Sequence, residues 1–139
     1  VVKRKIKDLA LEKAHAIARV ALEKEGEDIL VLDLTKSANI FNYFVLITAG
    51  SSKRVQSIAK AIDEELSVNW KQNARLEGKN NPSWTLVDAG DVIAHVFYKD
   101  ARNFYGIERL WLSAPREEIN EKCLKKTLKK KLSKSSAKA

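Results

Sequence analysis

Two strand-like segments, Trp84–Asp88 and Val92–Tyr98, are joined by the turn DAGD and lie only three residues apart. Both are rich in β-branched and aromatic residues, which favour extended backbone. Because the connection is so short, the second strand must fold back against the first, and the pair predicts an antiparallel hairpin. The polar groups inside it, including Asp88 and His95, then belong to a catalytic site, to the core or to a docking surface.

Helical and extended periodicities alternate along the rest of the chain. The predicted elements are a helix from Ile6 to Leu22, strands over Ile29–Leu34 and Tyr43–Thr48, a helix after the turn at residues 50–52, the hairpin, and a helix over residues 99–111. This order, α-β-β-α-β-β-α, predicts a single α/β domain of α+β-like character. Its sheet is expected to be mixed, with helices on at least one face.

The net charge of +8 is concentrated at the C-terminus. Residues 116–139 contain nine Lys or Arg and three Glu, so they hold +6 and residues 1–115 hold only +2. We therefore predict a domain over residues 1–115 and a basic tail over residues 116–139. The first part of the tail has apolar residues at the spacing of an amphipathic helix. The last part, SKSSAKA, has a composition typical of disordered segments.

Composition gives no sign of secretion or of a membrane span. The single cysteine, Cys123, cannot form an intramolecular disulfide, and the apolar runs are too short to cross a bilayer. We expect a cytoplasmic protein that does not contact membranes. A mitochondrial or plastid protein that has lost a transit peptide remains an alternative, because the sequence has no initiator methionine.

Candidates for catalysis are few. The chain has two histidines, His15 and His95, and no H-x-x-H or C-x-x-C spacing, so we predict no metal site, no cofactor and no catalytic residues. Alternation along the second hairpin strand places Ile93, His95 and Phe97 on one face. A single histidine there is more often a hydrogen-bonded structural or interface residue than a base.

The turn Gly50–Ser51 supports one enzymatic alternative. A Gly-Ser turn between a strand and a helix can hold a nucleotide phosphate, as in nucleotidyltransferase-type folds. Those enzymes also need a D-x-D pair on the next strand to bind Mg²⁺, and this chain offers only Asp88, with Asp91 across a turn. An ordinary N-cap is the other interpretation of the turn.

The tail is the candidate for contact with RNA, through Lys125, Lys126, Lys129 and Lys130. If about six lysines neutralised phosphates, log K would fall with log salt with a slope near −5. No aromatic residues are interleaved for base stacking, so sequence-specific reading is not expected. A solvated lysine run is the alternative.

Aromatic residues gather in and just after the predicted strands. Eight of the ten lie there: Tyr43, Phe44, Trp84, Phe97, Tyr98, Phe104, Tyr105 and Trp111. Some must form core. A sheet with helices on one face only would present the others to a partner. Tyr and Trp suit such surfaces because each has an apolar ring that can be buried and a polar group that can form hydrogen bonds.

Four segments together resemble the ribosomal silencing factor family, also called Iojap-like. They are DILVLDL, NYFVLITAGSSKRVQSIAKAI, WTLVDAGDVIAHVF and RNFYGIERLW, and the likeness covers about Leu9 to Trp111. The resemblance implies a nucleotidyltransferase-like domain without transferase activity. It also implies binding to ribosomal protein fourteen of the large ribosomal subunit, which would block subunit association and repress translation.

Two features depart from the family pattern. The chain reads Asn42-Tyr43-Phe44 where the family commonly has Asp-Tyr-Phe, which weakens any role of charge there. The basic tail extends beyond the family's usual end, and we suggest that it contacts ribosomal RNA.

The proposed docking residues are Tyr43, Trp84, Leu86, Asp88, His95, Phe97 and Tyr98, with Arg102 at the edge. Glu108 and Trp111 are expected to anchor the last helix to the domain. Three function classes stay open: a ribosome-silencing binding protein, a nucleotidyltransferase-like enzyme and a general basic RNA-binding protein. A homodimer of the free chain also stays open.

Overall fold

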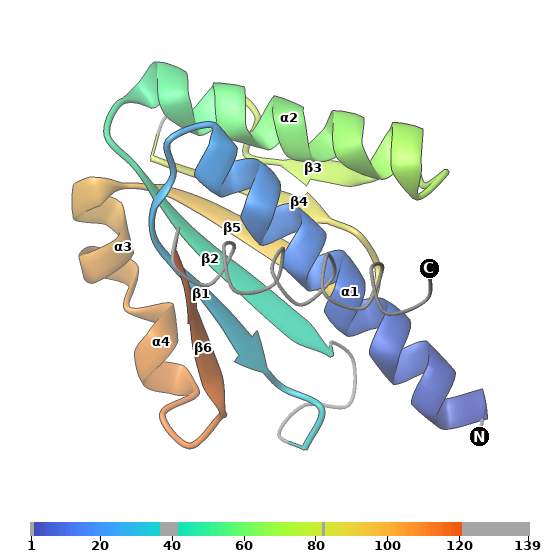
Figure 1. The fold of residues 1–139 in the computed structure, drawn as a ribbon. Coiled ribbons are helices and arrows are strands. Elements are labelled where there is room, and N and C mark those ends of the chain that lie inside the picture. The colour runs from blue at the N-terminus through green and yellow to red at the C-terminus, as the bar shows by residue number, and fades with distance from the viewer. Residues whose placement is uncertain (1, 37–41, 82, 121–139) are drawn as a thin grey trace.

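The computed structural model describes residues 2–36, 42–81 and 83–120. Its elements in chain order are α1 (Val2–Glu23), β1 (Glu27–Asp33), β2 (Tyr43–Ala49), α2 (Ser52–Asn69), β3 (Arg75–Glu77), β4 (Trp84–Asp88), β5 (Val92–Tyr98), α3 (Lys99–Tyr105), α4 (Ile107–Leu110) and β6 (Arg116–Ile119). Figure 1 shows them as one domain built around a single sheet.

The sheet has six strands in the order β3-β4-β5-β2-β1-β6. Only the central pair β2 and β5 is parallel, and the other neighbours are antiparallel. All seven residues of β2 are buried, as expected for an apolar strand with neighbours on both sides and helices on both faces. The prediction of a single mixed α/β domain is confirmed.

Helices cover both faces of this sheet. The helices α1 and α2 pack on one face through the larger core cluster, which includes Val45, Ile47, Ala94 and Val96. On the opposite face, α3, α4 and the segment after them enclose a smaller cluster built around Leu46. The expectation that one face would be left open is therefore not met.

The predicted hairpin is present with its predicted strand bounds, and its tip is fixed from several sides. Asp88 Oδ1 accepts a hydrogen bond from Gly90 N at 2.8 Å, and Gly90 adopts φ +84°, a conformation that favours glycine. Asp91 pairs with Lys13 of α1 at 2.9 Å. The Ala89 carbonyl accepts from Gln72 Nε2 at 2.7 Å. Both aspartates of the DAGD turn therefore hold the hairpin in shape.

The element order contains three pieces that the sequence did not predict. Two are short charged edge strands, β3 and β6, whose pairing depends on backbone hydrogen bonds rather than on apolar pattern. The third is α4, which is separated from α3 by Gly106 at φ +57°, a left-handed residue that ends one helix and starts the next.

The strand β6 also moves the domain boundary. Residues 116–119, which the sequence analysis placed in the tail, pair with β1 from Ile29↔Ile119 to Leu32↔Arg116. Glu117 of β6 further contacts His15 of α1, with Nε2 and Oε2 2.8 Å apart. The folded domain therefore extends past residue 115 to at least Ile119.

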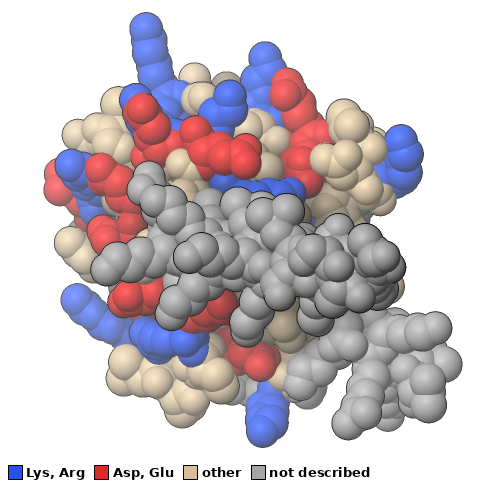
Figure 2. All heavy atoms as spheres, in the orientation of Figure 1, with Lys and Arg blue, Asp and Glu red and all other residues tan. Residues whose placement is uncertain are grey.

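The surface over α1 and α2 carries charges of both signs. In Figure 2, basic and acidic side chains lie side by side across the described part of this face. None of the described helices is long and apolar enough to cross a membrane.

Candidate functional site

A continuous row of rings runs across the face of the sheet that α3 and α4 cover. We call it the aromatic row, and it consists of Trp111, Phe44, His95, Phe97, Trp84, Tyr105 and Phe104. Ring centroids are 4.7 Å apart for Phe44 and His95 and 5.2 Å for Trp84 and Phe97. Trp84 lies directly opposite Phe97 in the β4–β5 register, so the antiparallel pairing brings these two rings together.

His95 is a buried, neutral member of this row. It is 4% exposed, and its Nδ1 accepts a hydrogen bond from Trp84 Nε1 at 3.2 Å. That bond leaves the proton on Nε2, which is buried and has no hydrogen-bond partner in the part of the chain that the structure describes. Burial lowers the pKa of His95 from 6.5 to about 4, because the charged form loses its water. His95 is therefore a core residue at neutral pH.

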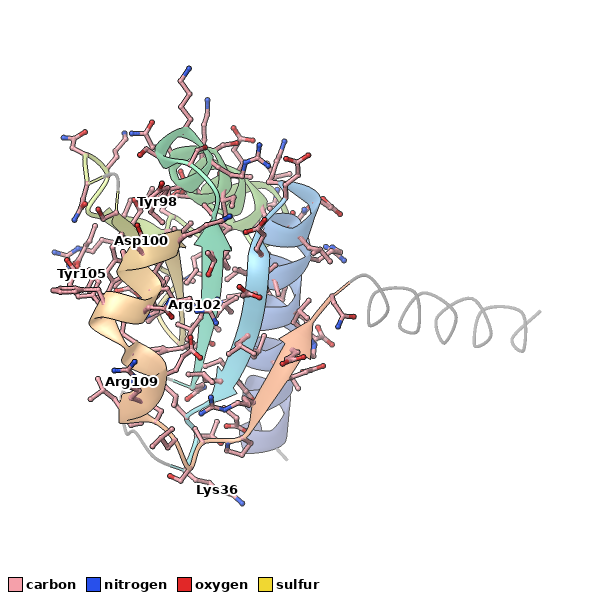
Figure 3. The ribbon with its side chains drawn as sticks, turned by 90° about the vertical axis from the view of Figure 1, so that its left-hand side faces the viewer. Lys36, Tyr98, Asp100, Arg102, Tyr105 and Arg109 are labelled. Carbon is pink, nitrogen blue, oxygen red and sulfur yellow. The ribbon has the colours of Figure 1, made fainter. Side chains whose placement is uncertain are left out.

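The row becomes exposed at its α3 end. Trp84 is half-buried, Tyr105 is 45% exposed and Phe104 is 82% exposed. Figure 3 shows Tyr105 projecting from α3 away from the sheet. Leu86 of β4 is also half-buried on the same face. We call Trp84, Leu86, Phe104 and Tyr105 the exposed aromatic end; it consists of two exposed rings beside two half-buried apolar side chains. Apolar groups gathered at a surface in this way are typical of an interaction site.

The predicted docking residues do not all share this surface. Tyr43 is 2% exposed and packs in the α1–α2 core, and Tyr98 packs against the same core. Phe97 is on the correct face but only 1% exposed. Asp88 is occupied in the hairpin turn. Trp84 and Leu86 are the predicted docking residues that the structure places, half-buried, in the exposed aromatic end.

Arg102 is an internal brace rather than an edge residue. Its side chain is 10% exposed, with Nε 2.6 Å from Glu108 Oε1 and Nη1 2.8 Å from Thr48 Oγ1. Nη1 also donates to the backbone carbonyl of Asp28. These bonds tie α3 and α4 to the ends of β1 and β2. Glu108 joins α4 to α3 through Arg102, and it is Arg102, not Glu108 as predicted, that bonds to the strands. The predicted anchoring role of Trp111, which packs in the smaller core cluster, is confirmed.

Phe104 and Tyr105 were missed as docking residues because the sequence predicted a single helix over residues 99–111, with no break after them. The signal that points to their exposure is the glycine that follows them. Gly106 ends α3 after only seven residues, too short a helix to bury more than one side, and Ala101 is its buried residue.

The Gly50–Ser51 turn acts as a helix cap. Ser51 has extended backbone and its Oγ accepts from Arg54 N at 3.2 Å, which makes it the N-cap of α2. Arg54 itself pairs with Glu25. Among the described residues there is no group of three or more His, Cys, Asp or Glu side chains placed to hold a metal ion. The candidate RNA contacts Lys125, Lys126, Lys129 and Lys130 lie outside the described residues.

Comparisons with known proteins agree with this fold. The crystal structure of a protein from Chromobacterium violaceum superimposes with a TM-score of 0.70 and 30% identity, over 73% of this chain and 84% of that one. A structure from Bacillus halodurans gives a TM-score of 0.67 with 30% identity, over 78% and 99%.

Named relatives occur in bacteria and in organelles. The chain is 40% identical over 98 residues to the ribosomal silencing factor RsfS of Bacillus subtilis, which covers 70% of this chain and 83% of that relative. It is 30% identical over 109 residues to the chloroplastic protein Iojap of Zea mays, covering 78% of this chain and 47% of that one. With both kinds of relative present, the cytoplasmic compartment stays a prediction.

A model of the family described as ribosomal silencing factor during starvation matches residues 7–139. The match reaches the last residue, so the basic tail, which the sequence analysis placed beyond the family's usual end, lies within the matched region. The matched region and the bacterial relatives together show that this chain belongs to the ribosomal silencing factor family.

Proposed function

We propose that the chain binds ribosomal protein fourteen of the large ribosomal subunit through the exposed aromatic end, and that this blocks association with the small subunit. The role is that of a binding protein that represses translation, and it requires no catalysis. The observation that carries the proposal is the exposure of Phe104 and Tyr105 beside Trp84 on a rigid support.

The support consists of the β4–β5 hairpin and α3, and both are held in place by side-chain hydrogen bonds. The β4–β5 hairpin is held at its tip by Lys13 and Gln72, and α3 is held by the Arg102 brace. The backbone that carries the rings therefore loses little further freedom on binding, so more of the contact energy appears as affinity.

The proposed mechanism is steric exclusion. Subunit joining requires two ribosomal surfaces to meet, and a bound chain of 15.7 kDa on one of them would keep the other away. A standard interface buries roughly 800 Å² on each partner, which a domain of this size can supply from one face.

Replacing Phe104 with alanine is expected to weaken binding to purified large subunits at least tenfold, about 1.4 kcal/mol. The ring is 82% exposed in the free protein, so its removal costs the fold little and the loss appears in affinity. Affinity is measured by co-sedimentation or interferometry. Subunit association, followed by light scattering, should then require at least tenfold more Phe104→Ala protein for the same inhibition.

Val68→Ala is the matched control, because Val68 is 63% exposed on α2, whose buried side packs on the opposite face of the sheet. It should bind within about twofold of the wild type. Equal binding by Phe104→Ala and the wild type, with both proteins folded, would place the docking surface elsewhere.

The tail has a separate proposed role in contacting ribosomal RNA. Because β6 belongs to the sheet, the informative truncation removes residues 121–139 and keeps Arg116–Ile119. This truncation should leave the domain folded and remove most of the salt dependence of binding. Unchanged affinity at low salt would show that the tail makes no such contact.

A further inference from the structure

A hollow of about 760 Å³ opens at the end of the sheet opposite the hairpin tip, next to the Arg102 brace. Its walls come from the starts of β1 and α3 and the ends of β2 and β6, and they include Glu27, Asp28, Thr48, Lys99 and Arg102. The volume falls within the range of about 300–1,000 Å³ that is usual for small-molecule sites. Nothing in the proposed docking to the ribosome uses it.

The position of this hollow is one where α/β folds commonly bind ligands. The parallel strands β2 and β5 end side by side, with Ala49 paired to Tyr98. The helix after β2 packs on one face of the sheet and the helix after β5 packs on the other, as Figures 1 and 3 show. Such a divergence leaves a crevice outside the carboxyl ends of the strands, which is the usual ligand position in open α/β sheets. The hollow lies on the α3 side of this crevice, where Thr48 and Lys99 line it.

The floor of the hollow offers hydrogen-bond donors. Thr48 is 5% exposed and the Arg102 side chain 10% exposed, so both lie deep. Arg102 uses Nε and Nη1 in its brace, while Nη2 makes no hydrogen bond to any of the residues that the structure describes. A guanidinium edge of this kind is suited to the oxygens of a carboxylate. Figure 3 shows Arg102 reaching from α3 toward the strands.

The rim of the hollow is acidic. The lining contains the Arg102–Glu108 pair, and Glu27, Asp28 and Lys99 lie at the mouth. Glu27 and Lys99 are 4.0 Å apart and more than half exposed, and Asp28 is exposed beside them. The charge left at the mouth is therefore negative, which favours an ammonium group there.

We propose that this hollow is a binding site for a free α-amino acid. The carboxylate of the ligand would be held by Nη2 of Arg102 at the floor, and its ammonium group would lie near Glu27 and Asp28 at the rim. Donors below and acids above select a small zwitterion over a pure anion, which the rim repels, and over a pure cation, which offers no acceptor to Nη2 of Arg102.

The test is calorimetric titration of the purified full chain with each standard amino acid. At least one is expected to bind with Kd below about 1 mM. Its α-amide, which lacks the carboxylate, and its N-acetyl form, which lacks the ammonium group, should each bind at least tenfold more weakly. A nucleoside monophosphate and spermidine serve as probes for anionic and cationic ligands.

A rim variant links the binding to this hollow. Glu27→Gln combined with Asp28→Asn removes two exposed carboxylates and keeps their shape, so the fold should persist and the affinity should fall at least tenfold. Glu64→Gln, exposed on α2, is the matched control and should bind as the wild type does. The proposal is overturned if no amino acid binds, if only the nucleotide or spermidine binds, or if the rim variant binds with unchanged affinity. The titration involves no ribosome, so its outcome is independent of the proposed docking.

Discussion

Acidification from pH 7 to pH 4 is expected to lower the free energy of unfolding by about 3 kcal/mol through His95 alone. Burial lowers the pKa of this residue to about 4 in the folded protein, against 6.5 for an ordinary histidine. Between these two pKa values, His95 is therefore protonated in the unfolded chain and neutral in the folded protein. The stabilisation is complete above about pH 6.5 and is lost progressively as the pH falls toward 4.

Urea unfolding at pH 7, 6, 5 and 4, followed by tryptophan fluorescence, measures this loss. His95→Gln keeps an acceptor for Trp84 Nε1 but does not titrate, so its stability should fall by about 3 kcal/mol less over the same range. His15→Gln, which removes the other, exposed histidine, serves as the comparison. Parallel profiles for the wild type and His95→Gln would contradict a buried neutral His95.

Replacing Arg102 with methionine is expected to destabilise the domain by about 2–3 kcal/mol. The change removes two hydrogen bonds that join α3 to β1 and β2 and a third that joins α3 to α4, and it leaves Glu108 without its cation. Glu108 is 32% exposed, so water offsets part of that loss and the figure stays below that of a fully buried pair. Urea unfolding at neutral pH measures the effect.

Arg109→Met is the matched control, because Arg109 is exposed on α4, and it should change stability by less than about 0.5 kcal/mol. Arg102→Lys should recover little stability, since one ammonium group cannot reproduce a guanidinium that bonds on two edges. If Arg102→Met were as stable as the wild type but bound large subunits poorly, Arg102 would instead belong to the docking surface, as the sequence first suggested.

The parts of the fold that were predictable are those in which local pattern and tertiary structure agree. The hairpin was found with its bounds because the turn between β4 and β5 is short and both strands are apolar. Alternation also placed Ile93, His95 and Phe97 together on one face. Tyr43 was misplaced because its face depends on the register of β2 against β5, where it pairs with Val92, and no local pattern encodes that register.

The edge strands, and the degree to which each aromatic side chain is exposed, could not be predicted from the sequence. The residues of β3 and β6 are mostly charged, and only their neighbours in the sheet make them strands. The docking surface likewise depends on where α3 stops, since Gly106 leaves Phe104 outside the core while Ala101 is buried. Sequence thus located the aromatic row, and the structure determined which end of it faces solvent.

The short strand β6 has a consequence for the solubility of shortened forms of this protein. It covers the outer edge of β1, whose central residues Ile29–Leu32 are apolar, and it replaces that edge with Arg116, Glu117 and Glu118. Charged edge strands discourage one sheet from adding to another. A fragment ending at residue 115 would leave the backbone N–H and C=O groups along this edge of the apolar strand β1 unpaired, and its molecules would tend to associate strand to strand into aggregates.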